Sequence, residues 1–307
     1  MPKDFVTLAD WTRDDLARIL ARAAELKALD ARGVRPQTLE GRTLAMLFEK
    51  PSLRTHVTFE AGMTQLGGHA LLLLPEQVGI GTRESAADVA RNLSRWVDGI
   101  VARTFRHELV EELAREASIP VINGLTDRLH PCQVMADLQT IAERARLGDA
   151  VIAYVGDGNN VVNSLLFGAA LFGLTLRVAT PDSHRPDERV RKRAEELAAR
   201  SGARLAFGVD PREAVRGAGF VYTDVWTSMG QEAERELRRR IFGPYQVNAA
   251  LLALAPEARV MHCLPAHRGE EITDEVLDGP RAIALDQAEN RLHSQKAILE
   301  ELLAHRD

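Results

Sequence analysis

The chain is poor in cysteine: it has two, Cys132 and Cys263, which stand far apart in unlike surroundings. Small domains that depend on disulfides carry more cysteines at closer spacing, so a disulfide framework is excluded. The simplest interpretation is a pair of free thiols in a reducing compartment, and we expect a cytoplasmic protein.

Aromatic residues make up only 5% of the chain, and the net charge is −5 without any basic tract. A nucleic-acid-binding surface needs clustered Lys and Arg, so we expect no nucleic-acid partner. No apolar run approaches the length of about 18 residues that a membrane span needs. Residues 1–11 lack the basic and then apolar regions of a signal peptide. We therefore expect neither a signal peptide nor a membrane partner.

What the chain does have is a regular alternation of short apolar runs with longer segments of helical periodicity. This alternation is typical of parallel βαβ units, and it restarts after residues 148–149. We predict an α/β protein of two domains, 1–147 and 148–307, each a mostly parallel sheet flanked by helices, with an active-site cleft between them. A last helix over about 287–305 could pack back on the N-terminal domain.

The predicted strands are 44–48, 69–74, 99–103, 119–122, 150–155, 174–179, 203–207, 218–223 and 259–263. The predicted helices are 12–29, 53–67, 84–97, 107–117, 130–147, 159–172, 186–200, 231–241, 245–254 and the last one, while 75–83 and 225–230 are predicted loops. Ligands of open α/β sheets bind beyond the carboxyl ends of the strands. That rule places together the polar residues that end or follow strands: Ser52, Arg103, Asn160, Asp224 and Cys263.

The stretch from Phe48 to Glu60 (FEKPSLRTHVTFE) joins a predicted strand to a predicted helix. Ser52 stands where an N-cap belongs, with Arg54 and Thr55 in the first turn. A helix N-terminus offers unpaired N–H groups, and with a guanidinium and two hydroxyls it can hold a phosphate. An ordinary capped helix with a solvent-facing arginine fits the same residues, so this stretch alone leaves both interpretations open.

His130 opens the segment HPCQ at the start of another predicted helix, with Pro131 at the first helical position. A histidine there can donate to a developing oxyanion, and Gln133, one turn on, offers an amide to the same ligand. A histidine that caps the helix or packs is the alternative. Cys132 is interpreted as packed, because a free cysteine is usually a small buried hydrophobe.

Residues 156–160 (GDGNN) follow a predicted strand and precede a helix, as a dinucleotide-binding loop does. Val161 stands where the third glycine of that fingerprint belongs, and Asp182 stands roughly where a ribose-binding acid is found. A nicotinamide dinucleotide loop therefore remains one interpretation. The other is a helix start at which Asn159 and Asn160 cap the helix or bind a carboxylate or amine.

Asp224 ends a predicted strand and opens the loop to Gly230. A carboxylate beside a hydroxyl and turned backbone groups can hold an α-amino acid, although a strand-end Asp is also a common turn residue. Cys263, in the segment HCLP, ends the last strand, where cations can activate a thiol; a structural cysteine is the alternative. The spacing between 130–132 and 262–263 matches no zinc pattern, so we expect no metal.

Taken in order, these segments resemble the aspartate/ornithine carbamoyltransferase family. The resemblance covers essentially the whole chain: SLRTH at 52–56, HPCQ at 130–133, DGNN at 157–160, DVWTSMG at 224–230, HCLP at 262–265 and AENRLHSQKAIL at 288–299. The first two motifs are common to the family, which binds carbamoyl phosphate, and the SMG and HCLP motifs are similar to those of its ornithine branch. The implied reaction transfers a carbamoyl group to the δ-amine of ornithine without metal or organic cofactor.

The resemblance also implies roles for individual positions, with His130, Arg103 and Cys263 as the catalytic residues. The positions that match carbamoyl-phosphate contacts of the family are Ser52, Leu53, Arg54, Thr55, Gln77, Arg103, His130, Pro131, Cys132, Gln133, Cys263, Leu264 and Arg291. The positions that match ornithine contacts are Asn160, Asp224, Ser228 and Met229. The family forms trimers in which the loop holding Gln77 reaches a neighbouring subunit, so a homotrimer or a multiple of it is implied.

The chain departs from the usual Ser-Thr-Arg-Thr-Arg of this branch at two positions, Leu53 and His56. A histidine at 56 leaves less fixed positive charge, so carbamoyl-phosphate affinity could be lower or pH-dependent. The nearest rival function is a sister transferase for putrescine, N-acetylornithine or aspartate. An NAD-dependent dehydrogenase and a non-catalytic binding protein are further alternatives, although both leave SLRT and HPCQ without a use.

Overall fold

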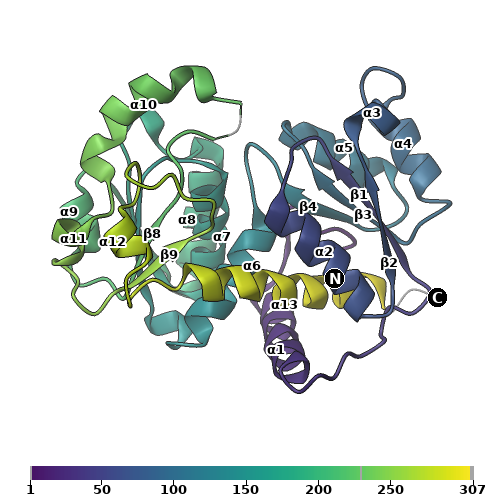
Figure 1. Cartoon of the computed structure of the whole chain (residues 1–307), viewed down its shortest axis with the longest axis horizontal. Helices are drawn as coiled ribbons and strands as arrows, with labels where there is room; N and C mark the ends of the chain where they lie inside the picture. The colour runs from purple at the N-terminus through teal and green to yellow at the C-terminus, as the bar shows by residue number, and fades with distance from the viewer. Residues whose placement is uncertain (1, 229, 305–307) are drawn as a thin grey trace. The chain divides into compact units, whose positions relative to one another are not determined.

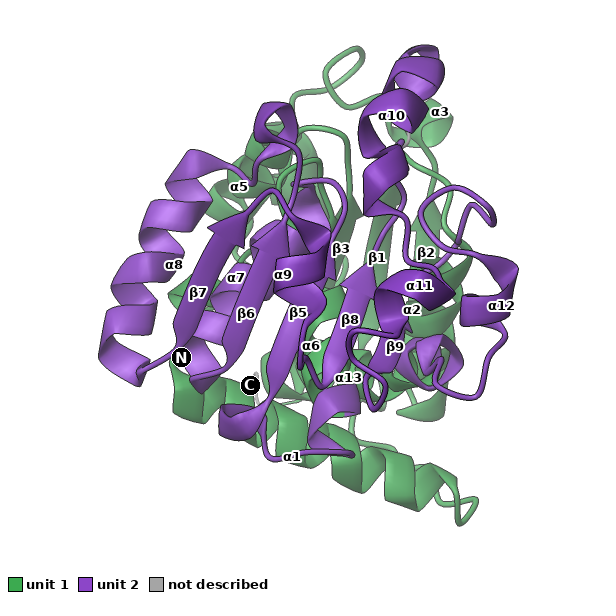
Figure 2. Ribbon diagram, turned by 90° about the vertical axis from the view of Figure 1, so that its left-hand side faces the viewer, with its two compact units in different colours: residues 1–139, 289–307 green, residues 140–288 purple. Residues whose placement is uncertain are grey.

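The computed structural model describes residues 2–228 and 230–304. The chain forms two compact units, coloured separately in Figure 2: unit 1 comprises residues 1–139 and 289–307, and unit 2 comprises residues 140–288. Within the described ranges, no helix is both long enough and apolar enough to cross a membrane. The domain limits given above, 1–147 and 148–307, stay a prediction.

Unit 1 is built on a four-stranded parallel sheet in the order β2-β1-β3-β4 (Figure 1). Its strands are β1 (Thr43–Phe48), β2 (His69–Leu73), β3 (Gly99–Arg103) and β4 (Val121–Leu125). The two central strands are buried along nearly their whole length, as parallel strands covered on both faces are. The register pairs Phe48 with Arg103, so β1 and β3 end side by side.

The helices that contribute to unit 1 are α1 (Arg13–Asp30), α2 (Leu53–Gln65), α3 (Pro75–Val78), α4 (Ala86–Leu93), α5 (His107–Glu116), α6 (Pro131–Ala142) and most of α13 (Ala284–Leu303). α4 and α5 bury apolar side chains in one cluster with the sheet. α13 packs closely against α2: a Cβ added at Gly62 of α2 would lie only 3.3 Å from Cγ of Lys296 in α13. α13 also holds α1 through Arg22, whose Nε donates to Glu300 Oε2 at 2.6 Å.

Unit 2 has a five-stranded parallel sheet in the order β7-β6-β5-β8-β9. Its strands are β5 (Val151–Val155), β6 (Thr175–Ala179), β7 (Arg204–Gly208), β8 (Phe220–Thr223) and β9 (Arg259–His262). The helices are α7 (Asn160–Phe172), α8 (Glu188–Ser201), α9 (Pro211–Val215), α10 (Arg235–Phe242), α11 (Ala249–Leu252) and α12 (Asp274–Leu277). α7 is mostly apolar and is buried from its second residue onward.

The predicted fold class, two mostly parallel sheets flanked by helices, is confirmed. Several element predictions were wrong in detail, and the short helices α9 and α12 were not predicted. β4 continues to residue 125, because Asn123 and Gly124, which resemble turn residues, still follow β3 past a register shift. The predicted loop 75–83 contains the single-turn α3, and the helix predicted over 130–147 ends at Ala142.

Candidate functional site

In unit 1 the strand order reverses direction between β1 and β3: the chain goes from β1 to β2 on one side and from β3 to β4 on the other. Open α/β sheets bind ligands beyond the carboxyl ends of their strands at such a switch point. Here β1 leads through a short turn into α2, and β3 ends at Arg103. The topology therefore predicts a ligand site at the first turn of α2 and at Arg103.

Ser52 caps α2 as predicted, since its side chain accepts a hydrogen bond of 3.2 Å from the N–H of Thr55. No acidic residue occupies the first turn, so the positive end of the helix dipole is not offset there. Arg54 is half-buried and Thr55 is buried. A guanidinium, a hydroxyl and backbone N–H groups thus gather at one helix start, which is the composition of a phosphate site.

His130 stands immediately before α6 and is 5% exposed. Burial lowers the pKa of His130 well below its usual range, and the charges of Arg291, Arg103 and Arg54 lower it further, in that order. Three arginines from separate segments of unit 1 therefore act on one imidazole. The imidazole is neutral at ordinary pH, so it can donate a hydrogen bond without adding charge.

Arg291, on α13, connects these parts. Its Nη1 donates to Gln133 Oε1 at 2.7 Å and its Nη2 donates to Thr55 Oγ1 at 3.0 Å. The nitrogen of the Gln133 amide donates to Asp137 Oδ1 at 2.9 Å, which turns the amide oxygen toward Arg291. All four side chains are buried, so the fork of the Arg291 guanidinium is held in a fixed direction.

The remaining unit 1 positions implied by the resemblance are placed as follows. Cys132 is fully buried and donates to the Asn123 carbonyl at 3.3 Å, and burial raises its pKa to about 12, so it is packed as predicted. Pro131 begins α6, and the Leu53 side chain is 73% exposed. Gln77 is exposed, and its Oε1 accepts from the N–H of Leu74 at 2.9 Å.

Lys50 is a candidate that the sequence interpretation missed. Its side chain is 6% exposed, and its ammonium lies 4.2 Å from the centre of the Phe105 ring. Burial lowers the pKa of Lys50, and the charge of Arg103 lowers it further. Its position could have indicated a role at the site, because Lys50 stands two residues beyond β1, at the same switch point as Ser52.

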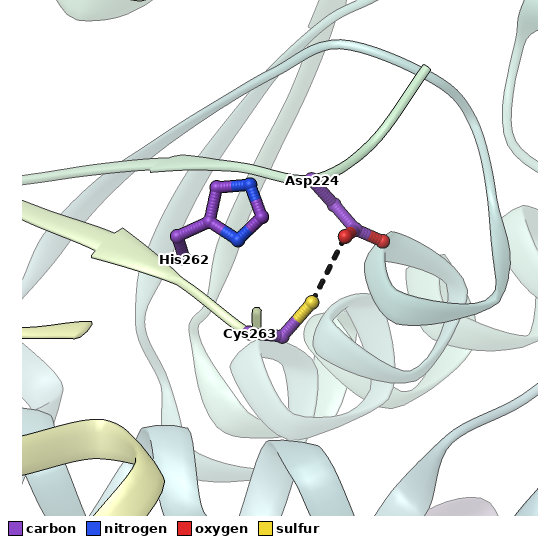
Figure 3. A group of neighbouring side chains, drawn as sticks. All are labelled: Asp224, His262 and Cys263. Atoms are coloured by element: carbon purple, nitrogen blue, oxygen red, sulfur yellow. Dashed lines mark hydrogen bonds between the residues drawn. The ribbon is translucent and has the colours of Figure 1, made fainter. Parts of the chain in front are cut away.

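In unit 2 the switch point lies between β5 and β8, and the segments that follow these strands carry Asn159 and Asp224. The Asp224 carboxylate, 6% exposed, is hydrogen-bonded at both oxygens. The Cys263 thiol donates to Oδ1 of Asp224 at 2.9 Å, as Figure 3 shows. Asn159 Nδ2 donates to Oδ2 of the same carboxylate at 2.7 Å. The thiol of Cys263 is therefore bonded to a carboxylate. The sequence analysis expected cations near this thiol.

A buried ion pair lies next to the segments that carry Asn159 and Asp224. Arg238, on α10, donates from Nη1 to Asp157 Oδ2 at 3.1 Å and to the Trp226 carbonyl at 2.9 Å. The two charged side chains are only 8% and 10% exposed. Burial raises the pKa of Asp157 to about 6, although Arg238 acts in the opposite direction. Arg238 thereby joins the turn after β5 to the loop that leads to Ser228.

The HCLP segment forms a tight turn in which Leu264 has a φ of 56°, a left-handed conformation unusual for leucine. The Leu264 N–H donates to His262 Nδ1 at 2.9 Å, and the other ring nitrogen of His262 lies 3.0 Å from Glu271 Oε1. His262 and Glu271 are both fully buried. The pair therefore holds the turn that carries Cys263 and Leu264.

Two groups of side chains in unit 2 have the composition of a cation site: Asp224, His262 and Cys263, and His267, Glu270 and Glu271. In the first, hydrogen bonds already engage both Asp224 oxygens and both His262 nitrogens. In the second, Glu270 is paired with Arg235. We derive no metal chemistry from either group.

The turn 156–159 does not resemble a dinucleotide cradle. A Cβ at Gly158 would lie 2.3–2.4 Å from backbone atoms of residues 184–186, so the space beside this glycine is filled by the protein's own chain. The Gly158 N–H donates to the His184 carbonyl at 3.0 Å. Asp182, the possible ribose ligand, pairs with Arg185. The geometry therefore favours the helix-cap interpretation over the nicotinamide one.

Of the other predicted ornithine contacts, Asn160 is the half-buried first residue of α7. Ser228 is half-buried and its N–H donates to Gln231 Oε1 at 3.1 Å. Met229 lies outside the described residues. The structure thus brings Asn159, Asp224 and Cys263 into direct contact. The sequence predicts Asn159 as a helix cap or as a residue that binds a carboxylate or amine.

Two family models match the chain. The carbamoyl-P binding domain of aspartate/ornithine carbamoyltransferase matches residues 3–143, and the Asp/Orn binding domain matches residues 149–302. The chain is 53% identical over 303 residues to an ornithine carbamoyltransferase of Anoxybacillus flavithermus, covering 98% of this chain and 96% of that protein. A solved ornithine carbamoyltransferase of Pyrococcus furiosus is 49% identical with a TM-score of 0.97, covering 100% and 98%. The Thermus thermophilus structure is 50% identical with a TM-score of 0.87, covering 99% of each chain.

Proposed function

The chain belongs to the aspartate/ornithine carbamoyltransferase family, and we propose that it transfers the carbamoyl group of carbamoyl phosphate to the δ-amine of L-ornithine. The products are L-citrulline and phosphate. The observation that carries this proposal is the buried guanidinium of Arg291, which joins Thr55 in the first turn of α2 to Gln133, one turn after His130. The charges of Arg291, Arg103 and Arg54 also lower the pKa of the buried His130. A small dianionic acyl phosphate is the kind of ligand that such a set of fixed donors recognises.

We assign carbamoyl phosphate to unit 1. Ser52, Arg54 and Thr55 at the start of α2, with Arg103, hold the phosphate oxygens. His130 donates to the carbamoyl oxygen. Arg291, held by Gln133 and Thr55, supplies a further positive charge beside the phosphate. The backbone at Leu53 and the helix start at Pro131 and Cys132 complete this set, and Gln77 belongs to it through a neighbouring subunit of a homotrimer.

We assign ornithine to unit 2. The Asp224 carboxylate receives the α-ammonium, while Asn160, Ser228 and Met229 contact the amino-acid end. Cys263 and Leu264, at the HCLP turn, face the δ-amine and the carbamoyl group. A free α-amine is what Asp224 selects, which disfavours putrescine and N-acetylornithine, and a cysteine at 263 disfavours aspartate.

The chemistry follows from these assignments. The unprotonated δ-amine attacks the carbamoyl carbon, negative charge develops on the carbonyl oxygen, and phosphate leaves with the electrons of the broken C–O bond. Arg54, Arg103 and His130 stabilise that charge, and each such fixed donor can contribute about 3 kcal/mol. Cys263 orients the amine or takes its proton, and it can pass that proton to Asp224. Holding both substrates in attack geometry contributes further.

One assay tests the proposal. The purified protein is supplied with carbamoyl phosphate and, in turn, ornithine, putrescine, N-acetylornithine or aspartate, and both phosphate release and the ureido product are measured. Citrulline formation with ornithine at the highest kcat/KM is expected. A higher kcat/KM with one of the other three amines would reassign the substrate, and no ureido product with any amine would reject the function. Light scattering on the same sample tests the homotrimer.

A further inference from the structure

Asn159 connects the start of α7 to the carboxylate of Asp224. Its Oδ1 accepts from the N–H groups of Val161 at 3.0 Å and Val162 at 3.3 Å, and from the Tyr154 hydroxyl at 3.3 Å. An N-cap must accept hydrogen bonds, so the amide oxygen is committed to these donors. The amide nitrogen then points the other way, where it donates to Asp224 Oδ2 at 2.7 Å.

The carboxylate of Asp224 is thereby fixed at both ends. Cys263 donates to Oδ1 and Asn159 donates to Oδ2, and the side chain is 6% exposed. Turning the carboxylate about its Cβ–Cγ bond would break both hydrogen bonds. Buried carboxylates need such donors, and bonds to a charged acceptor are roughly twice as strong as neutral ones.

We propose that Asn159 is a positioning residue for the amine substrate, because it sets the plane of the Asp224 carboxylate that receives the α-ammonium. This inference rests on the proposed function, in which Asp224 binds ornithine. Asn159 acts through Asp224 and not on the acyl phosphate. Its loss should therefore raise KM for ornithine and leave KM for carbamoyl phosphate unchanged.

The decisive variant is Asn159→Asp, which keeps an oxygen for the helix cap and nearly the same shape. It replaces the N–H donor with a second carboxylate oxygen beside Asp224. At pH 9 we expect KM for ornithine to rise by about tenfold to a hundredfold, the value of a hydrogen bond to a charged group. KM for carbamoyl phosphate should change by less than about twofold, since those contacts are untouched.

The pH profile separates positioning from capping. Two adjacent carboxylates share a proton as pH falls, and that proton restores a donor toward Asp224. The ratio of ornithine KM between variant and wild type should therefore shrink from pH 9 to pH 6. The other charged or titratable groups around this pair are Tyr154 on β5, Asp157 in the turn with its partner Arg238 on α10, and Cys263 after β9. His262 at the end of β9, with its partner Glu271, also lies beside Asp224. They are present in both proteins, so the ratio removes their common effect.

A matched control is Asn248→Asp. Asn248 caps α11 in the same unit, accepting from the Leu251 N–H at 3.0 Å. Its substitution should leave both KM values within about twofold of wild type. An ornithine KM for Asn159→Asp that is unchanged at pH 9, raised equally with that of carbamoyl phosphate, or raised by a pH-independent factor overturns the inference.

If Asn159→Asp does not fold, Asn159→Ser decides instead, because its hydroxyl can cap α7 but is too short to reach Asp224. A raised KM for ornithine alone supports the inference, and an unchanged or jointly raised KM overturns it. A wild-type protein that forms no citrulline would refute the proposed function separately, before any variant is compared.

Discussion

The guanidinium of Arg291 donates a hydrogen bond of 3.0 Å to the hydroxyl of Thr55, a residue 236 positions earlier in the chain. Helix α13 is thus joined to the first turn of α2, the candidate phosphate site. The second arm of the same guanidinium is held by Gln133. The C-terminal helix of the chain therefore contributes a cation to a site that is otherwise built from residues 50–133.

Arg291→Lys should weaken carbamoyl phosphate selectively. Lysine keeps the charge but cannot present two N–H groups in a fixed fork. We expect KM for carbamoyl phosphate to rise about tenfold or more, the loss of one charge-assisted hydrogen bond. Steady-state kinetics with each substrate varied measures this, and Arg268→Lys, an exposed arginine paired with Asp274 and Asp278, is the control. An equal rise of KM for ornithine would contradict the assignment.

His130→Ala should lower kcat about a hundredfold, the usual cost of one oxyanion donor. Burial and three arginines lower the pKa of His130 well below its usual range, so the wild-type imidazole should be neutral at pH 7 and above. NMR titration of its ring protons checks that directly. His293→Ala removes an equally buried histidine of α13 whose pKa is also lowered, and kcat should be kept. Near wild-type citrulline production by His130→Ala would remove this residue from the mechanism.

Asp224→Ala should raise KM for ornithine far more than KM for carbamoyl phosphate. The variant removes the acceptor for the α-ammonium, and a hydrogen-bonded charge of this kind is worth about 1.5–3 kcal/mol, or ten- to a hundredfold. Asp274→Ala, an exposed acid of unit 2, is the control. Competitive binding of norvaline, which lacks the δ-amine, isolates the amino-acid end of the site. Equal losses for both substrates would show that Asp224 does not bind ornithine.

Much of this site could be predicted because its parts are local. The cap of Ser52 on Thr55 follows from spacing within four residues, and the apolar runs before Ser52 and Asp224 give the strands that end there. The contact between Arg291 and Thr55 could not be predicted from the sequence, because no periodicity relates residues that lie so far apart in the chain. The family resemblance predicts both residues at the carbamoyl-phosphate site, but it does not predict the hydrogen bond between them.

The contacts of two further residues could not be predicted, for physical reasons. Lys50 looks like a surface residue beside Pro51, and only the fold shows that it is buried next to Arg103. Asn159 was recognised as a cap, but a cap occupies only the amide oxygen. The partner of the amide nitrogen is Asp224, which follows β8. The sequence of the turn at 156–160 does not show that β8 ends beside it.

His56 stands where the family's phosphate motif usually has arginine, and its Nε2 lies 2.9 Å from Glu60 Oε2. A guanidinium presents a charged fork of N–H donors that matches a phosphate, and an imidazole has no such fork. We expect His56→Arg to lower KM for carbamoyl phosphate by up to about fivefold, the value of an exposed ion pair. Glu60→Gln, which removes the carboxylate partner of His56, is the companion variant. An unchanged KM in His56→Arg would show that position 56 does not contribute to phosphate binding.

Asp157 should make the protein less stable as pH rises. Burial raises its pKa to about 6 in the folded protein from 3.8 when unfolded, so the folded state binds more protons between pH 4 and pH 6. Its contribution to stability is therefore present below pH 4 and is lost as pH rises through 6. The shift of about two pH units corresponds to about 3 kcal/mol.

Asp157→Asn removes this titration while leaving Arg238 charged at every pH. The free energy of unfolding of the variant minus that of the wild type should therefore increase by about 2 kcal/mol from pH 4 to pH 7. Unfolding midpoints of both proteins at pH 4, 5, 6 and 7 give this difference, and Asp278→Asn, an exposed acid, provides the baseline. The loss of the partner of Arg238 adds a constant offset that does not change with pH. A difference that stays constant between pH 4 and pH 7 would mean that the Asp157–Arg238 pair is ionised throughout, and that Arg238 outweighs the burial of the carboxylate.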